Sequence, residues 1–574
     1  MSRKRNKQKQ TLNHVGLWRL YLVRVVFISL ILGLAWRLAD IQVLNPDFLR
    51  HQGDARHVRH VPIPAHRGMI LDRHGEPLAI STPVHSVWFN PQDISADTTQ
   101  IKQLAKLLRV SQSSIKKKIK DGIKKHREFV YLKRRVTPEL ATKVKQLKIT
   151  GVGFQREYKR FYPAGEVTAH LVGFNNVDDQ GQEGLELTHN EYLKGVSGVK
   201  RLLRDSRGNY VGGGEQIKAS KDGENIMLSV DLRLQYLTYQ ALKSAVKSHH
   251  AKAGTAVILD VNTGEVLAMV NQPSFNPNNR KGLKQASLRN RAVIDLFEPG
   301  STVKPFTVAS GLKSGLYTMK SKIDTHPGRL KVNRLTVKDH RDYGVIDLAT
   351  LLKKSSNVGA SKIALSLKPE QLWQDFSAFG MGTLSGGYFP GESMGRMPDL
   401  SSWKKVERAT FSYGYGLNTS ALQLARAYTV LADGGVLRPV SFIKNEQIPT
   451  GHRVFSKDIM DNVRTMMQGV VKKDGTASRA AVENYTVAGK TGTIKKASQG
   501  GYAEGHYLSL FAGIIPANNP RLAMVVMIDD PQGKDYYGGL VAAPVFSEVM
   551  TGAMRLLNVA PDAMPESRML VARK

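Results

Sequence analysis

The 574 residues predict an α+β protein with a single N-terminal transmembrane helix, an elongated mixed α/β accessory (pedestal) domain, and a larger domain whose central antiparallel sheet is flanked by helices. Three observations predict this: one long apolar run near the start, a glycine-rich change of pattern near residue 222, and two strand hairpins far apart in the second half. The predicted parts are a basic cytoplasmic tail (1–14), the transmembrane helix (15–38), the accessory domain (39–222), the sheet domain (223–560) and a C-terminal tail (561–574).

The N-terminal segment predicts a membrane anchor. Residues 25–36 are an uninterrupted apolar run inside 15–38, and a helix of that span reaches about 36 Å, enough for a hydrocarbon core of about 30 Å. A buried core helix is the alternative, but Arg3, Lys4, Arg5, Lys7 and Lys9 precede the run. Basic flanks stay in the cytoplasm, and no small-residue cleavage site follows. We therefore expect a retained single-pass membrane protein with a large exported body.

Composition excludes several classes of protein. The chain has 83 Lys and Arg against 48 Asp and Glu, a formal net charge of +35, and no cysteine. A disulfide framework, a cysteine zinc site and a thiol nucleophile are excluded. Such charge suits nucleic acid, an anionic membrane or another acidic polymer. Export of the body removes nucleic acid as the expected partner.

The accessory part contains a Lys-rich stretch at 115–135, which predicts one cationic helix with a narrow apolar stripe of Ile115, Ile119 and Ile123. The stripe fits a solvated helix over a small core, or a surface for a partner or acidic polymer. The glycine run 208–214 predicts a linker before the boundary near 222. No metal site is expected at His51, His57, His60 and His66, since no carboxylate lies at ligand spacing.

The second half predicts a sheet built from both of its ends. Residues 254–271 predict two β-branched strands around an Asn-Thr-Gly turn, and residues 507–529 predict a second hairpin. A mainly helical region separates the hairpins, and an apolar helix is expected at about 540–557. Two hairpins with helices on their faces predict an antiparallel core.

A first motif with chemical potential is Ser301-x-x-Lys304. The pattern alone is weak, because it recurs from Ser197, Ser244, Ser401 and Ser441. Pro299 and Gly300 predict a turn into a helix, which places Ser301 in the first turn and Lys304 on the same face. A serine hydroxyl needs a base, and a lysine serves as one only when desolvation or another cation lowers its pKa. A second cation is therefore expected nearby.

Two further motifs supply the missing groups. Ser355 and Asn357 offer a hydroxyl to relay a proton and an amide to orient a substrate, although a helix cap is an equally simple interpretation. Lys490-Thr491-Gly492-Thr493 supplies the cation on a strand expected from residue 485, with Gly492 allowing close approach of a ligand. A phosphate-binding loop fails as an alternative, because the required first glycine is replaced by Asn484.

In this order the three motifs are those of penicillin-binding proteins and class A β-lactamases. The sequence resembles class B penicillin-binding proteins, most closely the division-specific peptidoglycan transpeptidases (FtsI type) of Gram-negative bacteria. The similarity extends to RGMILDRHGEPLA (67–79), RFYPAGEVTAHLVGF (160–174), GQEGLE (181–186) and DVNTGEVLAMVNQPSFNPNN (260–279). SSNVG and SYGYGL (412–417) favour the division branch over the elongation branch.

The resemblance implies a role for each motif residue. Ser301 would attack the carbonyl of the penultimate D-Ala of a stem peptide, releasing the terminal D-Ala. Lys304 would be the base, and Ser355 would shuttle protons. Asn357 would hold the donor peptide amide, and Lys490 would tune the electrostatic field.

The same resemblance assigns substrate binding to the last motif. Thr491 and Thr493 would bind the terminal carboxylate beside Gly492, and the oxyanion would lie between the backbone N–H groups of Ser301 and Thr493. No metal or organic cofactor is implied. The product would be a cross-link between stem peptides of septal cell wall.

Two other functions use the same residues. A hydrolase of the same fold, a carboxypeptidase or β-lactamase, would admit water to the acyl-enzyme, and a non-catalytic envelope scaffold would keep the motifs unused. The resemblance implies lipid-linked peptidoglycan precursors or nascent strands as substrate, and β-lactams as inhibitors. It also implies a SEDS-type glycan polymerase and other division proteins as partners, since no glycosyltransferase domain is expected in this chain.

Overall fold

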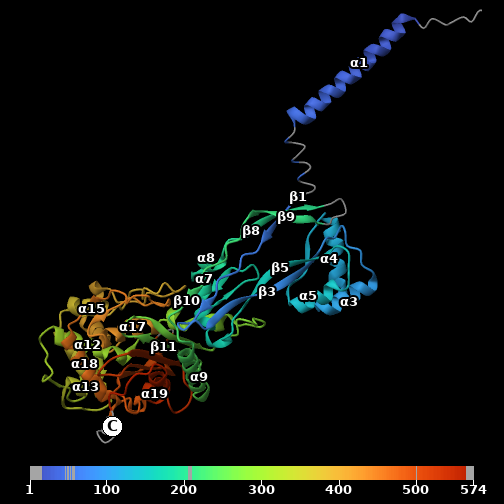
Figure 1. Ribbon diagram of the computed structural model, residues 1–574. Helices are drawn as coiled ribbons and strands as arrows, with labels where there is room; N and C mark the ends of the chain where they lie inside the picture. The colour runs from blue at the N-terminus through green and yellow to red at the C-terminus, as the bar shows by residue number, and fades with distance from the viewer. Residues whose placement is uncertain are drawn as a thin grey trace, which may run out of the picture.

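The computed structural model describes residues 16–45, 47, 51, 54, 58–204, 210–498 and 501–563. Helix α1 (Leu17–Ala39) stands apart from an elongated body (Figure 1). None of its side chains is buried, and in the described residues only the helical span 17–44 is long and apolar enough to cross a membrane. A soluble core helix would be buried, so the exposure fits the anchor. The predicted tail 1–14 and His57 lie outside the described residues.

The end of the body nearest α1 is a three-stranded antiparallel sheet (Figure 1). Its strands are β1 (Val58–Ile63), β8 (Gly198–Arg204) and β9 (Tyr210–Lys218). Gly212, Gly213 and Gly214 therefore lie in a strand, and the linker predicted there was wrong. A Cβ on Gly214 would lie 2.4 Å from Leu202 Cδ2, so glycine serves the close approach of β9 to β8.

The second accessory sheet is built around one long strand. Strand β3 (Pro77–Phe89) pairs with both β4 (Val130–Val136) and β5 (Val152–Phe161). The Lys-rich helix α4 (Gln112–Lys124) ends well before residue 135, so the single helix predicted for 115–135 was wrong. The following residues VYLKRRV are rich in β-formers and pair with β3, which overrides the helical pattern.

Short elements complete the accessory domain. Helices α3 (Thr98–Leu108) and α5 (Pro138–Lys145) enclose a small separate core with α4. The others are β2 (Ile70–Leu71), α6 (Ala169–Val172), β6 (Phe174–Asn175), β7 (Gly181–Glu183), α7 (Gly184–Thr188), α8 (Asn190–Lys194) and β10 (Ile226–Met227). Because β10 pairs with β2, the accessory sheet extends beyond the domain boundary near 222, which remains a prediction.

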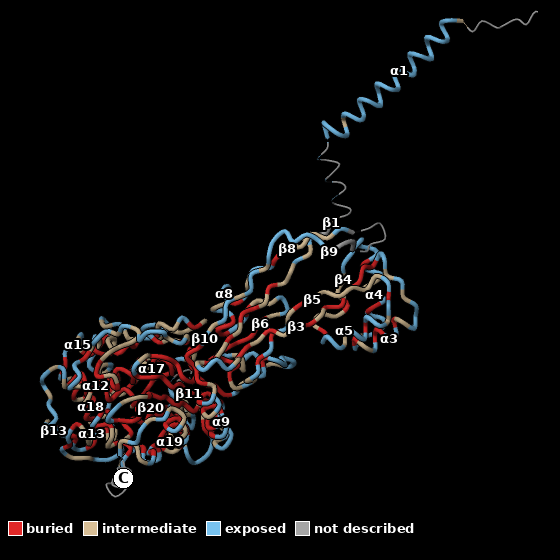
Figure 2. The backbone as a smooth tube through the Cα atoms, viewed as in Figure 1, coloured by how far each residue is buried: buried red, intermediate tan, exposed pale blue. Residues whose placement is uncertain are grey.

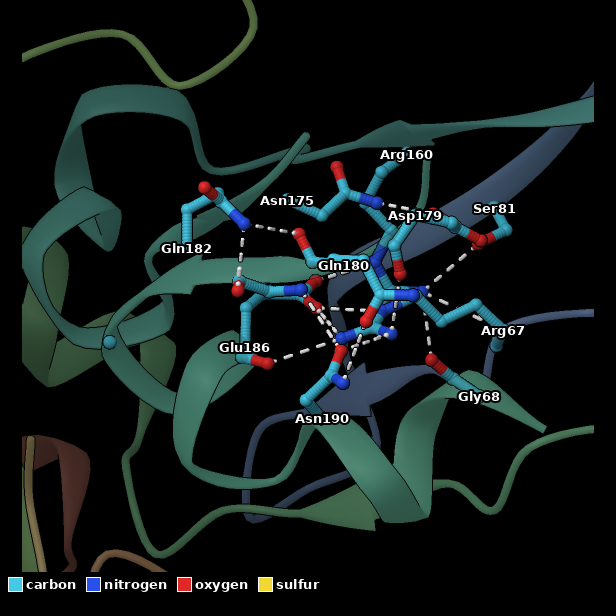
Figure 3. Close-up of polar contacts among 12 residues, drawn as sticks. Arg67, Gly68, Ser81, Arg160, Asn175, Asp179, Gln180, Gln182, Glu186 and Asn190 are labelled. Atoms are coloured by element: carbon cyan, nitrogen blue, oxygen red, sulfur yellow. Dashed lines mark hydrogen bonds and ion pairs between the residues drawn. The ribbon is translucent and has the colours of Figure 1, made fainter. Parts of the chain in front are cut away.

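A buried charge network, which we call the neck network, ties the accessory segments together (Figure 3). The guanidinium of Arg67 donates to Glu186 Oε2 at 2.6 and 2.8 Å, and Arg160 Nε donates to Glu186 Oε1 at 2.6 Å. All three side chains are fully buried. Removing the one carboxylate would leave two guanidinium groups without their charge partner.

The large domain contains the predicted antiparallel sheet. Its strand order is β12 (Val266–Gln272), β11 (Ala253–Asp260), β21 (Leu522–Asp529), β20 (Gly501–Ile515) and β19 (Ala488–Ser498). Helices α9 (Leu232–Ser248) and α19 (Gly538–Leu556) pack on each other and on the sheet, and α17 (Ala421–Ala432) packs on β11 and β21. Figure 2 shows this core as the largest buried region of the molecule.

The region between the two hairpins is mainly helical, as predicted. Its helices are α10 (Gln285–Leu288), α11 (Arg291–Ile294), α12 (Lys304–Lys313), α13 (Leu348–Lys354), α14 (Asn357–Ser366), α15 (Pro369–Ala378), α16 (Lys405–Phe411) and α18 (Lys457–Val471). Short strand pairs join them: β13 (Lys322–Asp324) with β16 (Val345–Asp347), β14 (Arg329–Val332) with β15 (Leu335–Lys338), and β17 (Val436–Leu437) with β18 (His452–Arg453).

Candidate active site

Ser301 lies in a short 3-10 turn, η3 (Gly300–Val303), that leads directly into α12. Gly300 has a φ of 55°, and a Cβ there would lie 2.5 Å from Ile494 Cγ1 of β19. The Tyr428 hydroxyl donates to the Thr302 carbonyl at 2.7 Å, which fixes the turn from the other side. Ser301 is partly exposed between buried neighbours. The fold thus presents its hydroxyl at the surface of a rigid turn.

Lys304 joins the first motif to the second. Its side chain is fully buried, and Nζ donates to the Ser355 carbonyl at 2.6 Å, to Ser355 Oγ at 3.0 Å and to Asn357 Oδ1 at 2.7 Å. Nζ therefore has three oxygen atoms within hydrogen-bond distance. In the described residues Ser301 Oγ makes no hydrogen bond to Lys304, although the two residues lie in adjoining helical turns.

Lys490 brings the third motif to the same point. It is fully buried on β19, and Nζ donates to Ser355 Oγ at 2.9 Å and to the Thr491 carbonyl at 3.2 Å. One hydroxyl therefore accepts hydrogen bonds from two lysines that lie 186 positions apart in the sequence. The structure brings together four of the predicted residues: Lys304, Ser355, Asn357 and Lys490.

The electrostatics of this cluster favour neutral amines. Burial lowers the pKa of Lys490 to about 7. Burial and the neighbouring Lys490 hold the pKa of Lys304 well below its ordinary value, opposed by the Asp339 carboxylate. A lysine with a lowered pKa is a competent proton acceptor near neutral pH. The second lysine that the sequence argument required beside Lys304 is therefore in place.

In the Ser355-Ser356-Asn357 segment, one serine caps a helix and the other contacts the two lysines. Ser355 ends α13 in the left-handed conformation (φ 59°), and Ser356 is the N-cap of α14, accepting from the Gly359 N–H at 2.9 Å. The helix-cap interpretation is thus right for Ser356. The chain reverses tightly at Ser355, between α13 and α14, and this directs the Ser355 hydroxyl toward the two lysines. The left-handed backbone conformation of Ser355 costs a non-glycine residue about 1–2 kcal/mol.

Asp339 organises this segment and was missed by sequence reasoning. Its carboxylate accepts from Ser356 Oγ at 2.5 Å, from the Asn357 N–H at 2.5 Å and from the Val358 N–H at 3.0 Å. The Asn357 amide donates to the Lys338 carbonyl at 3.0 Å. A lone aspartate in a loop carries no motif signal, because only the fold places it at the start of α14.

The last motif lines the edge strand of the sheet. Thr491 Oγ1 donates to Thr476 Oγ1 at 3.0 Å, and Thr493 Oγ1 accepts from the Gly538 N–H at 2.9 Å. A Cβ on Gly492 would lie 3.1 Å from Thr302 Cγ2 and 3.2 Å from the Pro299 carbonyl. The close approach expected of a ligand at Gly492 is thus made by η3 itself.

Within the described part of the chain, no group of three or more His, Asp or Glu side chains is arranged to hold a metal ion. The residues gathered at the site offer a surface-presented hydroxyl, two buried amines, a relay hydroxyl and an oriented amide. Such a set suits nucleophilic acyl transfer.

Two family models match the chain. Residues 254–551 match the penicillin-binding protein transpeptidase domain, and residues 62–228 match the penicillin-binding protein dimerisation domain. The chain belongs to the class B penicillin-binding proteins. It is an enzyme of peptidoglycan synthesis, a D,D-transpeptidase.

Individual relatives agree with this class. The chain is 41% identical to the peptidoglycan D,D-transpeptidase FtsI of Escherichia coli strain K12 over 98% of this chain and 96% of that protein. It is 40% identical to the probable peptidoglycan D,D-transpeptidase PbpC of Pseudomonas aeruginosa over 97% and 98%.

Solved structures agree as well. The transpeptidase domain of penicillin-binding protein 3 from Burkholderia pseudomallei matches 59% of this chain and 98% of its own, with a TM-score of 0.55 and 42% identity. A peptidoglycan synthetase from Bifidobacterium adolescentis matches 88% and 98%, with a TM-score of 0.71 and 27% identity.

Proposed function

We propose that the protein cross-links stem peptides of septal peptidoglycan through a serine acyl-enzyme. Ser301 Oγ attacks the carbonyl carbon of the penultimate D-Ala while Lys304 Nζ accepts its proton. The C–N bond to the terminal D-Ala breaks, Ser355 Oγ delivers a proton to the departing amine, and Lys304 Nζ returns its proton to Ser355. An amine of a second stem peptide then attacks the ester carbonyl and gives up one proton through Ser355 to Lys304. The new C–N bond replaces the C–O bond to Ser301, whose Oγ regains its proton from Lys304.

The observation that carries this proposal is the convergence of Lys304 and Lys490 on Ser355 Oγ, at 3.0 and 2.9 Å. Two fully buried amines cannot both stay charged at low cost, so the cluster favours a neutral Lys304 beside the serine turn. A single hydroxyl between both amines provides a route for the proton from one to the other. A lysine with only a structural role would need neither a second buried amine beside it nor a hydroxyl shared with that amine.

Binding follows from the remaining motif residues. Asn357 orients the donor peptide amide, and Thr491 and Thr493 hold its terminal carboxylate along β19, the last strand in the sheet order. The free side of an edge strand pairs readily with an extended peptide. The backbone N–H groups of Ser301 and Thr493 would stabilise the oxyanion of the tetrahedral intermediate.

The same proposal places the enzyme in the cell. Helix α1 anchors the chain in the inner membrane with its N-terminus in the cytoplasm and both folded domains in the periplasm. Lipid-linked precursors or nascent strands are the substrate, a SEDS-type polymerase and other division proteins are partners, and β-lactams acylate Ser301. The predicted domain limits belong to this proposal, with the acyl-transfer domain beginning near residue 223.

The test is acylation of the full chain in detergent by a fluorescent penicillin, with label and its decay followed over hours. We expect stable label on the wild type and none on Ser301→Ala. Ser401→Ala is the matched control, since Ser401 begins another Ser-x-x-Lys pattern and is exposed in a short 3-10 turn (Leu400–Ser402), and it should label normally.

Other results would point elsewhere. Label that forms and disappears within seconds would identify a hydrolase, and a folded wild type that takes no label would leave the scaffold function. Label that persists on Ser301→Ala would show that another residue is the nucleophile.

A further inference from the structure

An open apolar groove lies between α3 and α4, at the end of the accessory domain away from the large domain (Figure 1). It has a volume of about 590 Å³. Its floor is formed by Ile101 of α3, Ile119 and Ile123 of α4, and Ile94 and Ala96 of the preceding loop. Ile123 remains 47% exposed, so the described chain does not fill the groove.

The rim of the groove has one sign of charge. Lys116, Lys120 and Lys124 line it, each exposed, and no acidic side chain lines it among the described residues. A repeat of four residues on α4 places each lysine beside the apolar stripe. Of that stripe, Ile115 is buried in the small core, which leaves Ile119 and Ile123 to face the groove. The groove is therefore apolar inside and cationic along its edge.

This combination selects one kind of occupant. A second copy of the chain is disfavoured by its net charge of +35. A flat lipid surface contacts protruding apolar side chains, whereas this apolar surface is recessed. An amphipathic helix presents an apolar stripe with charges on either side, and acidic flanks would pair with the three lysines.

We propose that the groove between α3 and α4 binds an acidic amphipathic helical segment of a partner protein. Its apolar side chains would rest on Ile119 and Ile123, and its carboxylates would lie against Lys116, Lys120 and Lys124. Burial of the partner's apolar side chains in the groove supplies binding affinity. The lysines of the rim fix the position of the partner helix along the groove and make its binding depend on salt concentration. The site lies in the accessory domain, so it is separate from acyl transfer.

The test uses the full chain in detergent micelles and a fluorescein-labelled synthetic 18-residue peptide with leucines on one helical face and glutamates on both flanks. A scrambled peptide of the same composition is the reference. By fluorescence anisotropy we expect the amphipathic peptide to bind at least tenfold more tightly than the scrambled one. Ile123→Asn should weaken binding tenfold, and Lys120→Gln should weaken it about threefold and reduce its salt dependence.

Lys117→Gln is the matched control, because it removes the same charge from the same helix at a residue that does not line the groove. Equal binding of the scrambled peptide, or equal losses from Lys117→Gln and Lys120→Gln, would overturn the proposal in favour of non-specific charge attraction. Binding of anionic phosphatidylglycerol vesicles that is lost in Ile123→Asn would overturn it in favour of a lipid surface. An unchanged circular dichroism spectrum and unchanged thermal unfolding of every variant verify folding of the accessory domain.

Discussion

The side chains of Lys304 and Lys490 share one hydrogen-bond acceptor, Ser355 Oγ. A hydroxyl has two lone pairs, so it accepts from both amines and keeps its own hydrogen to donate. Each added positive charge lowers the affinity of the other amine for a proton. The protonation state of this pair is therefore the property most sensitive to neighbouring charges, of which Asp339 is the acidic one.

Asp339→Asn is expected to move the pH dependence of acylation. The Asp339 carboxylate raises the pKa of Lys304, against burial and Lys490, which lower it. Its removal lowers that pKa further, so the base stays neutral to lower pH. The acid limb of the rate constant for penicillin acylation should shift to lower pH, while the plateau falls about tenfold because Asn357 loses a charged acceptor at its N–H.

Asp342→Asn is the control for this shift. Asp342 lies in the same loop and accepts from His326 and from the Gly344 N–H, but it has no hydrogen bond to the motif among the described residues. Its acid limb should coincide with that of the wild type. If Asp339→Asn lowers the acylation rate constant equally at every pH and does not shift the acid limb, then Asp339 only caps the start of α14 and does not influence the pKa of Lys304.

Gly300→Ala is expected to disable the nucleophile by moving its turn. The residue has a positive φ, and the new Cβ would collide with Ile494 Cγ1 of β19. Backbone strain alone costs about 1–2 kcal/mol, and the collision pushes η3 away from the strand. Penicillin acylation should fall at least tenfold, measured as the second-order rate constant.

Gly282→Ala separates strain from collision. Gly282 has a φ of 69°, and nothing lies within 4 Å of a Cβ built there. It should lower the melting temperature slightly and leave acylation unchanged. If both variants acylate at the wild-type rate, the contact between η3 and β19 does not position Ser301.

Local pattern was enough to predict much of the fold. The hairpin strands β11 and β12 are β-branched apolar runs on either side of a turn signal, and α19 is a long apolar run, so neighbouring residues encode them. Strands β4 and β9 were missed for the opposite reason. The lysines of β4 and the glycines of β9 suit a helix or a loop locally, and backbone pairing overrides this pattern: β4 pairs with β3, which lies far away in the sequence, and β9 pairs with the preceding strand β8.

The site shows the same division. Spacing predicted Lys304, Ser355, Asn357 and Lys490, because each lies in a short motif with a chemical reason for its residue types. Asp339 has no such signal, since its contacts with Asn357 and Val358 arise from the packing of a loop on a helix start. Sequence reasoning likewise expected a ligand beside Gly492, where the fold places η3.

Glu186→Gln is expected to destabilise the accessory domain strongly. The substitution removes the carboxylate that pairs directly with both Arg67 and Arg160 in the neck network, where all three side chains are fully buried (Figure 3). Breaking a buried ion pair costs about 3–5 kcal/mol. Thermal unfolding of the full chain in detergent should show a clearly lowered first transition.

The control for the neck network is Asp178→Asn. Asp178 pairs with Arg134 at 2.8 Å, but its side chain is 65% exposed, so the change should stay within about 0.5 kcal/mol. Similar transition temperatures for the two variants would mean that solvent reaches the neck network.

Lys490→Met is expected to change how stability depends on pH. The folded-state pKa of Lys490 is about 7, against an ordinary value of 10.5. Below pH 7 both states bind the proton, and the burial penalty is complete. Between pH 7 and 10.5 the unfolded state binds more protons, so wild-type stability rises with pH by roughly 3–5 kcal/mol.

Methionine does not titrate, so the variant should lose the part of this rise that comes from Lys490 and keep only the part that comes from the buried Lys304. Its melting temperature should exceed that of the wild type at pH 6.5, and the difference should shrink at pH 9.5, while penicillin acylation is nearly abolished. Lys472→Met, at an exposed lysine, should keep the wild-type dependence. Lys490→Met that follows the wild-type curve would show that Lys490 is solvated, and then its charge could not lower the pKa of Lys304.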